Sequence, residues 1–385
     1  MPINILICDL VGLAFDDKGN PDPSEVKAHI EAKGGAFQVG GMPQSGEGGG
    51  LQFYYHPDIS TRGEILTLSE KEQFDAVIAA ATVIPIEAKF RFGGVRIGAG
   101  TGNMGSMSWG GPNGVGGTAP LMNTPGFNAR ATAQMTMKAL LHFRPGLPFA
   151  VLHQRVVDGT FDTGKNLREF PTAKLEGQTV AVIGYGNIGR EVARLASAFG
   201  MNVKVAARQP HHGQIVDDGF TAFKNAVDAV RGADVVSVHT GLGTLDAATG
   251  HFSNQGLLNS EMLAAMNAGA TVLNFDRGEC VDAAALDHAM SSGHVANATI
   301  DADIFRAFDG SLSGPLVPYL PLAQKYGRRI LLLPHAAADT DHPSRVAGAK
   351  QAVDQIFDTI LNKRITNLKG DLPAGYVNAG VKLGI

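Results

Sequence analysis

The chain has 385 residues, which is long for a single hydrophobic core and predicts two domains. An apolar fraction of 44% and a charged fraction of 18% are those of a globular protein, and a net charge of −4 favours neither a nucleic acid nor a membrane as partner. Only Cys8 and Cys280 are present, without metal-ligand spacing or a disulfide framework, so we expect a cytoplasmic protein with no bound metal.

The first part of the sequence alternates between strand and helix patterns. Residues 4–10 indicate a strand rather than a signal peptide, and residues 23–33 carry apolar side chains at helical spacing. Residues 63–68 and 76–81 have the composition of further strands. This alternation predicts a small α/β domain, and no run in the chain reaches the length of a membrane span.

A glycine-rich segment, residues 93–120, follows and holds the only tryptophan, Trp109. It is either a flexible connection or a loop whose backbone contacts a ligand. Residues 129–141 then have the apolar spacing of a helix, and helical patterning continues to about Arg155.

Strand and helix patterns also alternate over the second half of the chain. Strands are expected at residues 179–183, 203–207, 233–239, 270–275, 297–301 and 329–333, with helices at residues 188–199, 260–266, 283–291 and 342–361. This order predicts a doubly wound parallel sheet with right-handed connections.

Residues 179–208 contain the glycine turn GYGNIG between a strand and a helix. Gly184 permits a tight turn, Gly186 lets the backbone approach a pyrophosphate, and Gly189 lets the helix lie close to the strand. The helix N-terminus adds N–H donors and the positive end of the helix dipole. The segment therefore predicts a dinucleotide site.

The second strand of this unit lacks the terminal acid that commonly binds the ribose 2′-hydroxyl of NAD. Ala207 stands there, eighteen residues after Gly189, and is followed by Arg208, His211 and His212. Because no carboxylate would repel a 2′-phosphate, we expect NADP as the preferred cofactor and NAD as the second candidate. The alternative is that the three basic side chains form an ordinary solvated loop.

Polar residues stand where several of the predicted strands end. His239, Arg277, Asp301 and His335 each close or directly follow such a strand. Ligands of parallel sheets bind beyond the carboxyl ends of the strands, so these side chains are expected in one crevice. For His239, a structural hydrogen-bonding role is the alternative.

Taken in order, these pieces resemble the D-isomer-specific 2-hydroxyacid dehydrogenase family from about residue 96 to residue 367. The motifs that carry the resemblance are RIGAGTGN at residues 96–103, NTPGFN at residues 123–128, the glycine turn, SVH at residues 237–239 with Gly243 and Thr244, NFDRG at residues 274–278 with Val281 and Asp282, and PHA at residues 334–336 with Thr340. A lone GxGxxG motif is weak evidence, whereas this ordered set is specific.

The resemblance implies reduction of a 2-keto acid and the reverse oxidation of a D-2-hydroxy acid. A cation must hold the substrate carboxylate, and Arg277 suits that role. A group that titrates near neutral pH must exchange a proton with the carbonyl oxygen, and His335 suits that role. The cofactor-binding residues implied are Gly184, Gly186, Asn187, Ile188, Gly189, Arg208, His239, Thr244 and Asp301, the last towards the carboxamide. The substrate-binding residues implied are Gly98, Ala99, Gly100 and Arg96, the arginine being used towards a phosphate by some relatives.

The chain departs from the family pattern twenty-nine residues after Arg277, where a glutamate usually pairs with the histidine and raises its pKa. Arg306 stands there and cannot serve that purpose. Asp303 and Asp309 are the carboxylates that could replace it, and we select Asp303 as a catalytic residue. Gly102 also replaces an aspartate of many relatives, so we expect an atypical substrate pocket.

The expected architecture is α/β, with two doubly wound domains. A Rossmann-type cofactor domain, residues 128–336, would be inserted in a smaller flavodoxin-like substrate domain made of residues 1–127 and 337–385. Closure of the two domains would exclude water from the crevice. The resemblance also implies a homodimer, because the region of residues 128–155 packs across a twofold axis in the family; an ordinary core helix is the alternative.

Two functions remain open at this point. The first is an NADP-preferring 2-keto acid reductase, whose partner is a small 2-keto or 2-hydroxy acid. The second is a non-catalytic dinucleotide-binding scaffold or corepressor-like protein, which the missing glutamate motivates. The retained Arg277 and His335 argue against the second, because a scaffold has less need of both.

Overall fold

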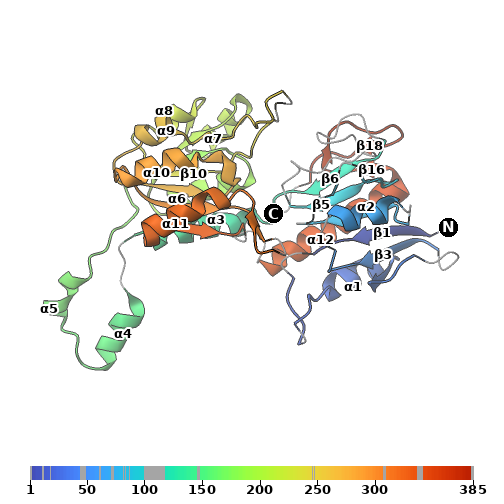
Figure 1. The fold of residues 1–385 in the computed structure, drawn as a ribbon, viewed down its shortest axis with the longest axis horizontal. Helices are drawn as coiled ribbons and strands as arrows, with labels where there is room; N and C mark the ends of the chain where they lie inside the picture. Colours follow the sequence, from blue (N-terminus) through green and yellow to red (C-terminus); the bar gives the residue numbers. More distant parts are fainter. Residues whose placement is uncertain are drawn as a thin grey trace. The chain divides into compact units, whose positions relative to one another are not determined.

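The computed structural model describes the chain except for residues 1, 11–12, 18, 44–48, 60–61, 71–72, 81, 83, 86, 99–117, 145–147, 245, 247, 307–308, 336–340 and 383–385. Two compact units make up the chain (Figure 1). Unit 1 is Met1–Ala131 with Ala338–Ile385, and unit 2 is Thr132–Ala337, inserted in unit 1. These bounds lie close to those expected from the sequence, while the roles assigned to the two domains stay predictions.

Unit 1 is an α/β unit built on one large sheet. The strands of the large sheet are β1 (Ile3–Ile7), β2 (Ala36–Val39), β3 (Leu51–Tyr55), β4 (Ala76–Ala79), β5 (Gly94–Ile97), β6 (Leu121–Thr124) and β17 (Leu368–Lys369). Two further strands, β16 (Arg364–Ile365) and β18 (Val377–Asn378), pair with each other in parallel. The helices of unit 1 are α1 (Ser24–Ala32), α2 (Arg62–Glu70), α12 (His342–Phe357) and the π-helical turn η7 (Asp358–Asn362), and α3 (Ala129–His142) leads the chain into unit 2.

The strand order in the unit 1 sheet is β17-β6-β5-β4-β1-β3-β2. All neighbours are parallel except β17, which pairs antiparallel with β6. The central order β3-β1-β4-β5-β6 is that of a flavodoxin-like doubly wound sheet, extended at one edge by β2. The expected flavodoxin-like fold of this unit is confirmed.

One predicted element of unit 1 is wrong. Residues 63–68, expected as strand, lie within helix α2. Ile65 is 0% exposed and Leu68 is 6% exposed, so these side chains, three residues apart, share the inner face of a helix, as in an amphipathic helix. The run is too short for this spacing to be told from a strand pattern.

Unit 2 carries the longer alternation of strands and helices. Its strands are β7 (Thr179–Ile183), β8 (Asn202–Ala206), β9 (Thr221–Phe223), β10 (Val235–Val238), β11 (Ala270–Asn274), β12 (Val295–Asp301), β13 (Phe305–Arg306), β14 (Leu312–Ser313) and β15 (Ile330–Leu333). Its helices, besides α3, are α4 (Phe149–Val157), α5 (Thr163–Asn166), α6 (Asn187–Ala198), α7 (His212–Asp217), α8 (Ala226–Val230), α9 (Ser260–Ala265), α10 (Ala283–Ser291) and α11 (Leu320–Tyr326), with short 3-10 turns η2 (Leu167–Glu169), η3 (Gln209–His211), η4 (Gly278–Cys280), η5 (Val317–Tyr319) and η6 (Gly327–Arg329).

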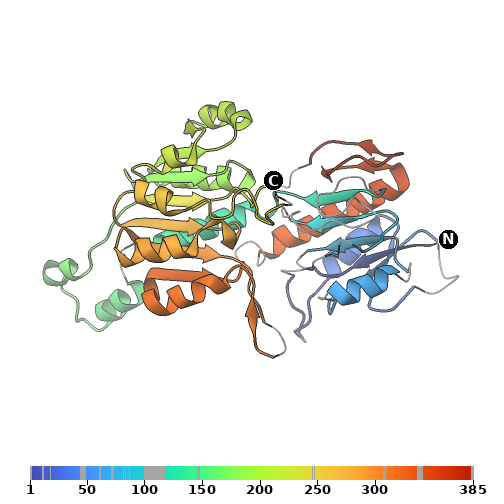
Figure 2. The same ribbon diagram turned by 45° about the horizontal axis from the view of Figure 1, so that its top comes forward.

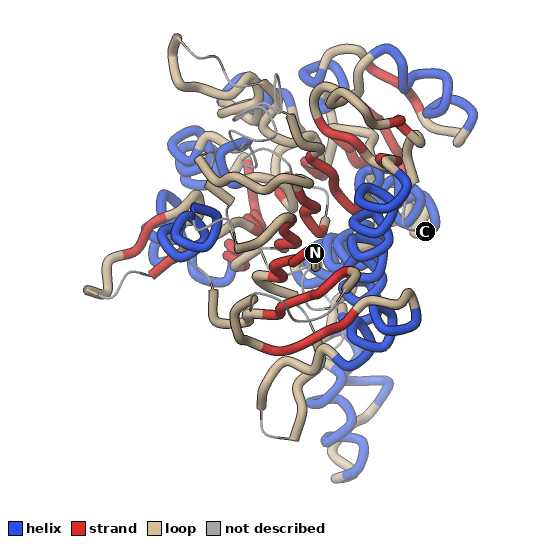
Figure 3. The backbone as a smooth tube through the Cα atoms, turned by 90° about the vertical axis from the view of Figure 1, so that its right-hand side faces the viewer, coloured by secondary structure: helices blue, strands red, loops and turns tan. Residues whose placement is uncertain are grey.

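The large sheet of unit 2 is parallel throughout, in the order β15-β12-β11-β10-β7-β8-β9. The order reverses between β7 and β10, which is the Rossmann arrangement, and ligands bind at such a switch point beyond the carboxyl ends of the strands. The predicted Rossmann-type unit is confirmed. Figure 3 draws the helices of the chain in blue and its strands in red.

Alternate residues of each central strand feed two cores, one on each face of the sheet. In β7, Val180 and Val182 belong to the core under α6, and Ala181 and Ile183 to the core under the helices of the opposite face. Burial on both faces explains why these strands are continuous apolar runs in the sequence. Among the described residues, no helix has both the length and the apolar character that a membrane span requires.

Two parts of unit 2 stand away from its sheet. Helices α4 and α5 extend from the body on a long excursion of the chain (Figure 1), and α4 has no buried residue. Strands β13 and β14 pair as an antiparallel hairpin, which projects in orange in Figure 2.

Candidate active site

The glycine turn after β7 is shaped by two close backbone approaches. Gly184 has φ +99°, and a Cβ there would lie 2.3 Å from the carbonyl oxygen of His239. A Cβ on Gly189 would lie 2.1 Å from the carbonyl oxygen of Gly184. At Gly186, in contrast, no described atom lies within 4 Å of a Cβ position. Two glycines are thus required by the protein itself, while Gly186 leaves open space beside the turn.

Helix α6 begins at the open side of this turn. Asn187 and Ile188 are its first residues, so their N–H groups have no carbonyl one turn earlier within the helix. The first backbone bond of the helix runs from the Arg190 N–H to the Gly186 carbonyl, at 3.0 Å. A pyrophosphate beside Gly186 would face these N–H groups and the positive end of the helix dipole. The turn therefore fits a dinucleotide.

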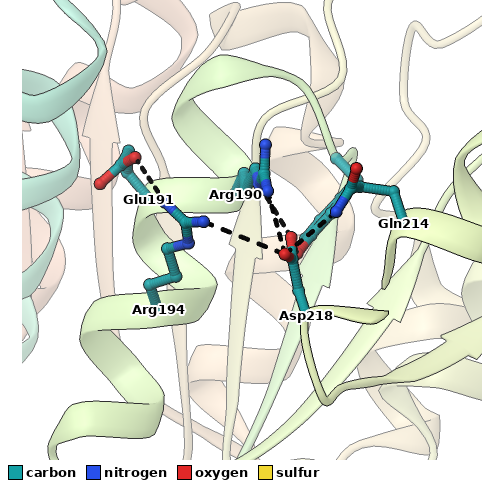
Figure 4. A network of polar contacts seen from close by, with 6 residues as sticks. Arg190, Glu191, Arg194, Gln214 and Asp218 are labelled. Carbon is teal, nitrogen blue, oxygen red and sulfur yellow. Dashed lines mark hydrogen bonds and ion pairs between the residues drawn. The ribbon is translucent and has the colours of Figure 1, made fainter. Parts of the chain in front are cut away.

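Asp218, directly after α7, is hydrogen-bonded to Arg190 of α6 (Figure 4). Its carboxylate accepts a bidentate pair from Arg190, at 2.8 and 2.9 Å, as Figure 4 shows. It also accepts a 2.6 Å hydrogen bond from the Tyr185 hydroxyl. Gln214 of α7 donates a further bond at 3.1 Å. The hydrogen bond from Arg190 is the largest influence that lowers the pKa of Asp218, to about 2. No local pattern in the sequence indicates this network, because its members are up to 33 residues apart in the chain.

The segment after β8 carries the groups expected near a 2′-phosphate. Ala207 directly follows β8, and its N–H bonds to the carbonyl of Phe223 at 3.1 Å. Arg208 is exposed and leads into η3. The His212 ring turns back to the chain, with Nε2 at 2.9 Å from the Ala207 carbonyl oxygen. The side chains at this strand end are therefore basic or neutral, as the sequence indicates.

His239 lies buried at the end of β10. Its Nε2 is 2.7 Å from the Ser237 hydroxyl, and burial lowers the pKa of His239 to about 3, so the ring is neutral. Its Nδ1 is buried without a hydrogen-bond partner in the described part of the chain. Buried ring nitrogens normally have a partner, so Nδ1 fits a bound group. Thr244 lies farther along the same loop, exposed, with its N–H bonded to the Ser253 hydroxyl at 3.1 Å.

Arg277 and Asp303 form an ion pair at the ends of adjacent strands. Arg277 follows β11 and Asp303 follows β12, and the Nη1–Oδ2 distance is 3.5 Å. The two side chains are 31% and 37% exposed, so the pair lies at the surface of the unit. The guanidinium is thus held by one carboxylate and stays open to solvent, as a site for an anion requires.

His335 is paired with Asp301. Its Nδ1 lies 3.4 Å from Asp301 Oδ2 and 3.3 Å from the Asp301 carbonyl oxygen. Burial lowers the pKa of His335, but the hydrogen bond and charge of Asp301, together with the charge of Asp303, outweigh it and raise the pKa overall. Asp303, selected from the sequence as the partner of His335, contacts Arg277 and acts on the histidine through its charge.

The backbone at His335 has φ +54°, the left-handed region that side chains rarely adopt. Such residues cost about 1–3 kcal/mol and persist where the surrounding structure holds them. Asp301 is 2% exposed, and its Oδ1 has no hydrogen-bond partner among the described residues. The strained backbone of His335 and the buried carboxylate of Asp301 mark this strand end as a site.

The position where the family has its glutamate lies on the projecting hairpin. Arg306 is in β13 and is exposed, as is Asp309 on the same hairpin. The Asp309 carboxylate accepts from the N–H and hydroxyl of Ser311, at 2.9 and 2.6 Å. The hairpin therefore supplies no described carboxylate partner to His335.

Asp276 is a further residue that was not among those predicted from the sequence. It precedes Arg277, and its Oδ2 accepts a hydrogen bond from the Gly241 N–H. Burial raises the pKa of Asp276, against the opposing charges of Arg277 and His335. Its place inside the NFDRG motif is the only signal that could have identified it.

The predicted substrate loop begins in unit 1. Arg96 lies in β5, and Gly98, with φ +104°, donates its N–H to the Thr124 hydroxyl at 3.0 Å. A cavity of about 10 Å³, the size of one water, adjoins Gly98 and the buried Arg345 of α12. Ala99, Gly100 and Trp109 lie outside the described residues.

Comparison with known proteins gives a family match over unit 2. Residues 148–337 match the model of the D-isomer specific 2-hydroxyacid dehydrogenase NAD binding domain. Rat D-3-phosphoglycerate dehydrogenase is 30% identical over 249 residues, which are 64% of this chain and 42% of that enzyme. A putative 2-hydroxyacid dehydrogenase of Haemophilus influenzae is 30% identical over 173 residues, 45% of this chain and 49% of that protein. The chain thus spans less than half the length of these relatives.

Solved structures share the fold. An NADPH-dependent glyoxylate/hydroxypyruvate reductase from Sinorhizobium meliloti superposes with a TM-score of 0.61 at 20% identity, covering 98% of this chain and 100% of that one. The NAD⁺-bound 3-phosphoglycerate dehydrogenase of Entamoeba histolytica gives 0.60 at 17% identity, covering 94% and 96%. The family match and the two curated relatives support assigning the chain to the D-isomer specific 2-hydroxyacid dehydrogenase family, and the solved structures show the same fold.

Proposed function

We propose that this protein is an NAD(P)-dependent oxidoreductase that interconverts a 2-keto acid and a D-2-hydroxy acid, with NADP(H) preferred. The observation that carries the proposal is the pair of contacts at neighbouring strand ends, Arg277–Asp303 and His335–Asp301. In the first pair, the Arg277 guanidinium can bind the carboxylate of the substrate. In the second, His335 can donate a proton to the substrate's carbonyl oxygen. A 2-keto acid needs both groups within a few ångströms.

In this reaction Arg277 binds the substrate carboxylate. A guanidinium donates two parallel hydrogen bonds to a carboxylate, and the ion pair with Asp303 restrains the direction of the Arg277 group. Exposure of 31% leaves donors of Arg277 open to the substrate. Binding by two hydrogen bonds orients the neighbouring carbonyl carbon.

His335 then supplies the proton. Because Nδ1 faces Asp301, Nε2 is the nitrogen that delivers the proton to the carbonyl oxygen and takes it back in the oxidative direction. Asp301 stabilises the imidazolium, the role that a glutamate has in most of the family. The residue that replaces the glutamate is thus Asp301 at the strand end, with Asp303 acting through its charge.

The nicotinamide cofactor, when bound, supplies or accepts the hydride at its C4 atom. Gly184, Gly186 and Gly189 give its pyrophosphate a close approach to α6. The unpartnered Oδ1 of Asp301 and Nδ1 of His239 are the buried polar atoms that suit its carboxamide end. Ala207 and Arg208 support NADP, because the strand end offers a basic side chain and no acid.

Several finer points belong to the same proposal. Arg96 and Gly98, with Ala99 and Gly100, are proposed to bind the substrate, and Thr244 the cofactor. We also propose a cytoplasmic homodimer. The relatives named above are dehydrogenases and reductases, which does not favour a non-catalytic scaffold or corepressor.

Initial rates test the proposal. Purified protein is assayed with NADPH and with NADH against glyoxylate, hydroxypyruvate and phosphohydroxypyruvate. We expect oxidation of NADPH with at least one acid, and a kcat/KM for NADPH about tenfold or more above that for NADH, equivalent to about 1.4 kcal/mol. Arg277→Ala should raise KM for the acid, and His335→Ala should lower kcat. No oxidation of either cofactor with any acid would sink the proposal.

A further inference from the structure

Asp276 is a buried carboxyl group that the proposed chemistry does not use. It stands two residues beyond β11, directly before Arg277, and its Oδ2 accepts a hydrogen bond from the Gly241 N–H. Gly241 stands three residues beyond β10, which pairs parallel with β11. One side chain therefore joins the loops that leave two adjacent strands at their carboxyl ends.

On one side of the Asp276–Gly241 hydrogen bond, residues 274–277 form a turn held by hydrogen bonds. The Asp276 N–H bonds to Oδ1 of Asn274 at 3.2 Å, and Nδ2 of Asn274 donates to the Arg277 carbonyl at 2.9 Å. Asn274 is 0% exposed. The carboxyl group of Asp276 is thus attached to the same short turn that sets the direction of Arg277.

The Gly241 side is held by the same part of the chain. The Gly241 carbonyl accepts from Asn254 Nδ2 at 2.9 Å and from the Cys280 thiol at 3.7 Å. Cys280 lies in η4, three residues after Arg277, and is buried. The N–H and the carbonyl of Gly241 are therefore both hydrogen-bonded to side chains. Asp276, from the Arg277 turn, and Cys280, from η4, are two of these.

The charges around Asp276 indicate that its carboxyl group lies near both Arg277 and His335. Arg277 and His335 both act on the Asp276 carboxyl through their charges and lower its pKa, although burial, the larger influence, raises it. A hydrogen bond from a backbone N–H offsets part of the cost of burying a carboxyl group. The hydrogen bond from the Gly241 N–H can therefore persist whether the carboxyl group of Asp276 is protonated or ionised, because Oδ2 can accept it in both forms.

We propose that Asp276 is a positioning residue that fastens the loop of residues 239–244 to the Arg277 turn and thereby couples cofactor binding to the binding of the substrate carboxylate. This inference rests on the proposed function, in which that loop borders the cofactor and Arg277 binds the acid. A cofactor that orders the loop then also orders the arginine. Because coupling of this kind is reciprocal, each ligand tightens the other by the same factor.

Ligand binding to the whole protein tests the coupling without turnover. The dissociation constant of oxamate, an unreactive 2-keto acid analogue, is measured by calorimetry with and without saturating NADPH. We expect NADPH to tighten oxamate about tenfold in the wild type, within the usual range for coupled sites. Asp276→Leu, which branches at the same carbon and has no acceptor, should reduce this factor by about fivefold or more. Asp276→Asn keeps an oxygen for Gly241 and should retain most of the coupling.

Controls separate the possible failures. Asp309→Asn removes an exposed carboxylate from the hairpin and should leave the coupling factor unchanged. If Asp276→Leu does not fold, Asn254→Ala, which loosens the same glycine from the other side, must lower the factor instead. Wild-type coupling in whichever of these two variants folds would overturn the inference. Wild-type protein that binds no NADPH and reduces no acid would instead overturn the proposed function.

Discussion

At the scale of single residues, His335 combines a strained backbone with opposing influences on its charge. Burial favours the neutral ring, while Asp301 at 3.4 Å and the charge of Asp303 favour the imidazolium. The imidazolium is the form that donates a proton in keto acid reduction, so the rate of reduction should fall as pH rises through the pKa of His335.

Asp301→Asn should move this fall to lower pH. The variant removes the carboxylate that raises the pKa of His335, so the imidazolium is lost earlier as pH rises. We expect the midpoint of kcat/KM for reduction to decrease by about one pH unit, equivalent to about 1.4 kcal/mol. The pH–rate profile from pH 5 to 10 gives the measurement, with Asp309→Asn as the control. An unchanged midpoint would mean that another group sets the pKa.

The network at Asp218 should contribute to stability rather than to chemistry. Its side chain is 11% exposed and accepts from Arg190 and Tyr185. Removing the charge by Asp218→Asn should cost about 1–3 kcal/mol of unfolding free energy, because a charged hydrogen-bond pair is lost. Urea denaturation at pH 7 provides the value, and Asp228→Asn, at a surface ion pair 56% exposed, is the matched control.

The same network predicts a dependence on acid. Because the pKa of Asp218 is lowered from 3.8 to about 2, its contribution is present above the unfolded-state value and is lost as pH falls from about 4 to about 2. The difference in unfolding free energy between wild type and Asp218→Asn should therefore shrink over that interval. A difference that stays constant down to pH 2 would contradict the lowered pKa.

At the scale of elements, different glycines of the glycine turn are expected to serve folding and ligand binding. An alanine at Gly189 would place its Cβ 2.1 Å from a backbone oxygen, so α6 could not approach β7. We expect Gly189→Ala to destabilise unit 2 by about 3 kcal/mol or more, beyond the usual cost of overpacking. Gly186→Ala meets no described atom within 4 Å and should melt as the wild type does, while binding NADPH at least about tenfold more weakly.

Thermal melts and NADPH fluorescence titrations measure both effects. Gly213→Ala, in α7, also meets no described atom within 4 Å and serves as the control for an innocuous methyl group. If Gly186→Ala bound NADPH as tightly as this control, the phosphates would not approach the turn as proposed.

At the scale of the whole molecule, the excursion that carries α4 is unusually apolar for a surface. Phe149 is 80% exposed, Val156 63% and Val157 65%. Exposed apolar surface of this kind marks a contact with another protein, and a second copy of the chain is the occupant we propose. Phe149 and Val156 are seven residues apart and share one face of the helix.

Light scattering at micromolar concentration should give the mass of a dimer. Phe149→Glu combined with Val156→Glu should give a monomer, because two charges would be buried without partners. Val216→Glu, at an equally exposed valine of α7, should remain dimeric. A wild-type protein that is monomeric would remove the idea.

Local patterns in the sequence were sufficient for much of this molecule. Strands buried on both faces are continuous apolar runs, so β7, β10 and β11 and their order along the chain could be predicted, and the glycine turn with them. Shorter elements could be predicted less well from the sequence. The segment now in α2 was expected as strand, and β2 and β3 were not expected at all, since a few residues do not define a period.

By itself, the sequence determined the class of fold, the cofactor turn and the four polar strand ends, because each is written in neighbouring residues. Only the tertiary structure decided which side chains meet. It paired His335 with Asp301 and Arg277 with Asp303, carried Arg306 out onto a hairpin, and brought Asp276 to Gly241. These contacts join segments separated by tens of residues, and their distances follow from strand register and loop path, which no local spacing encodes.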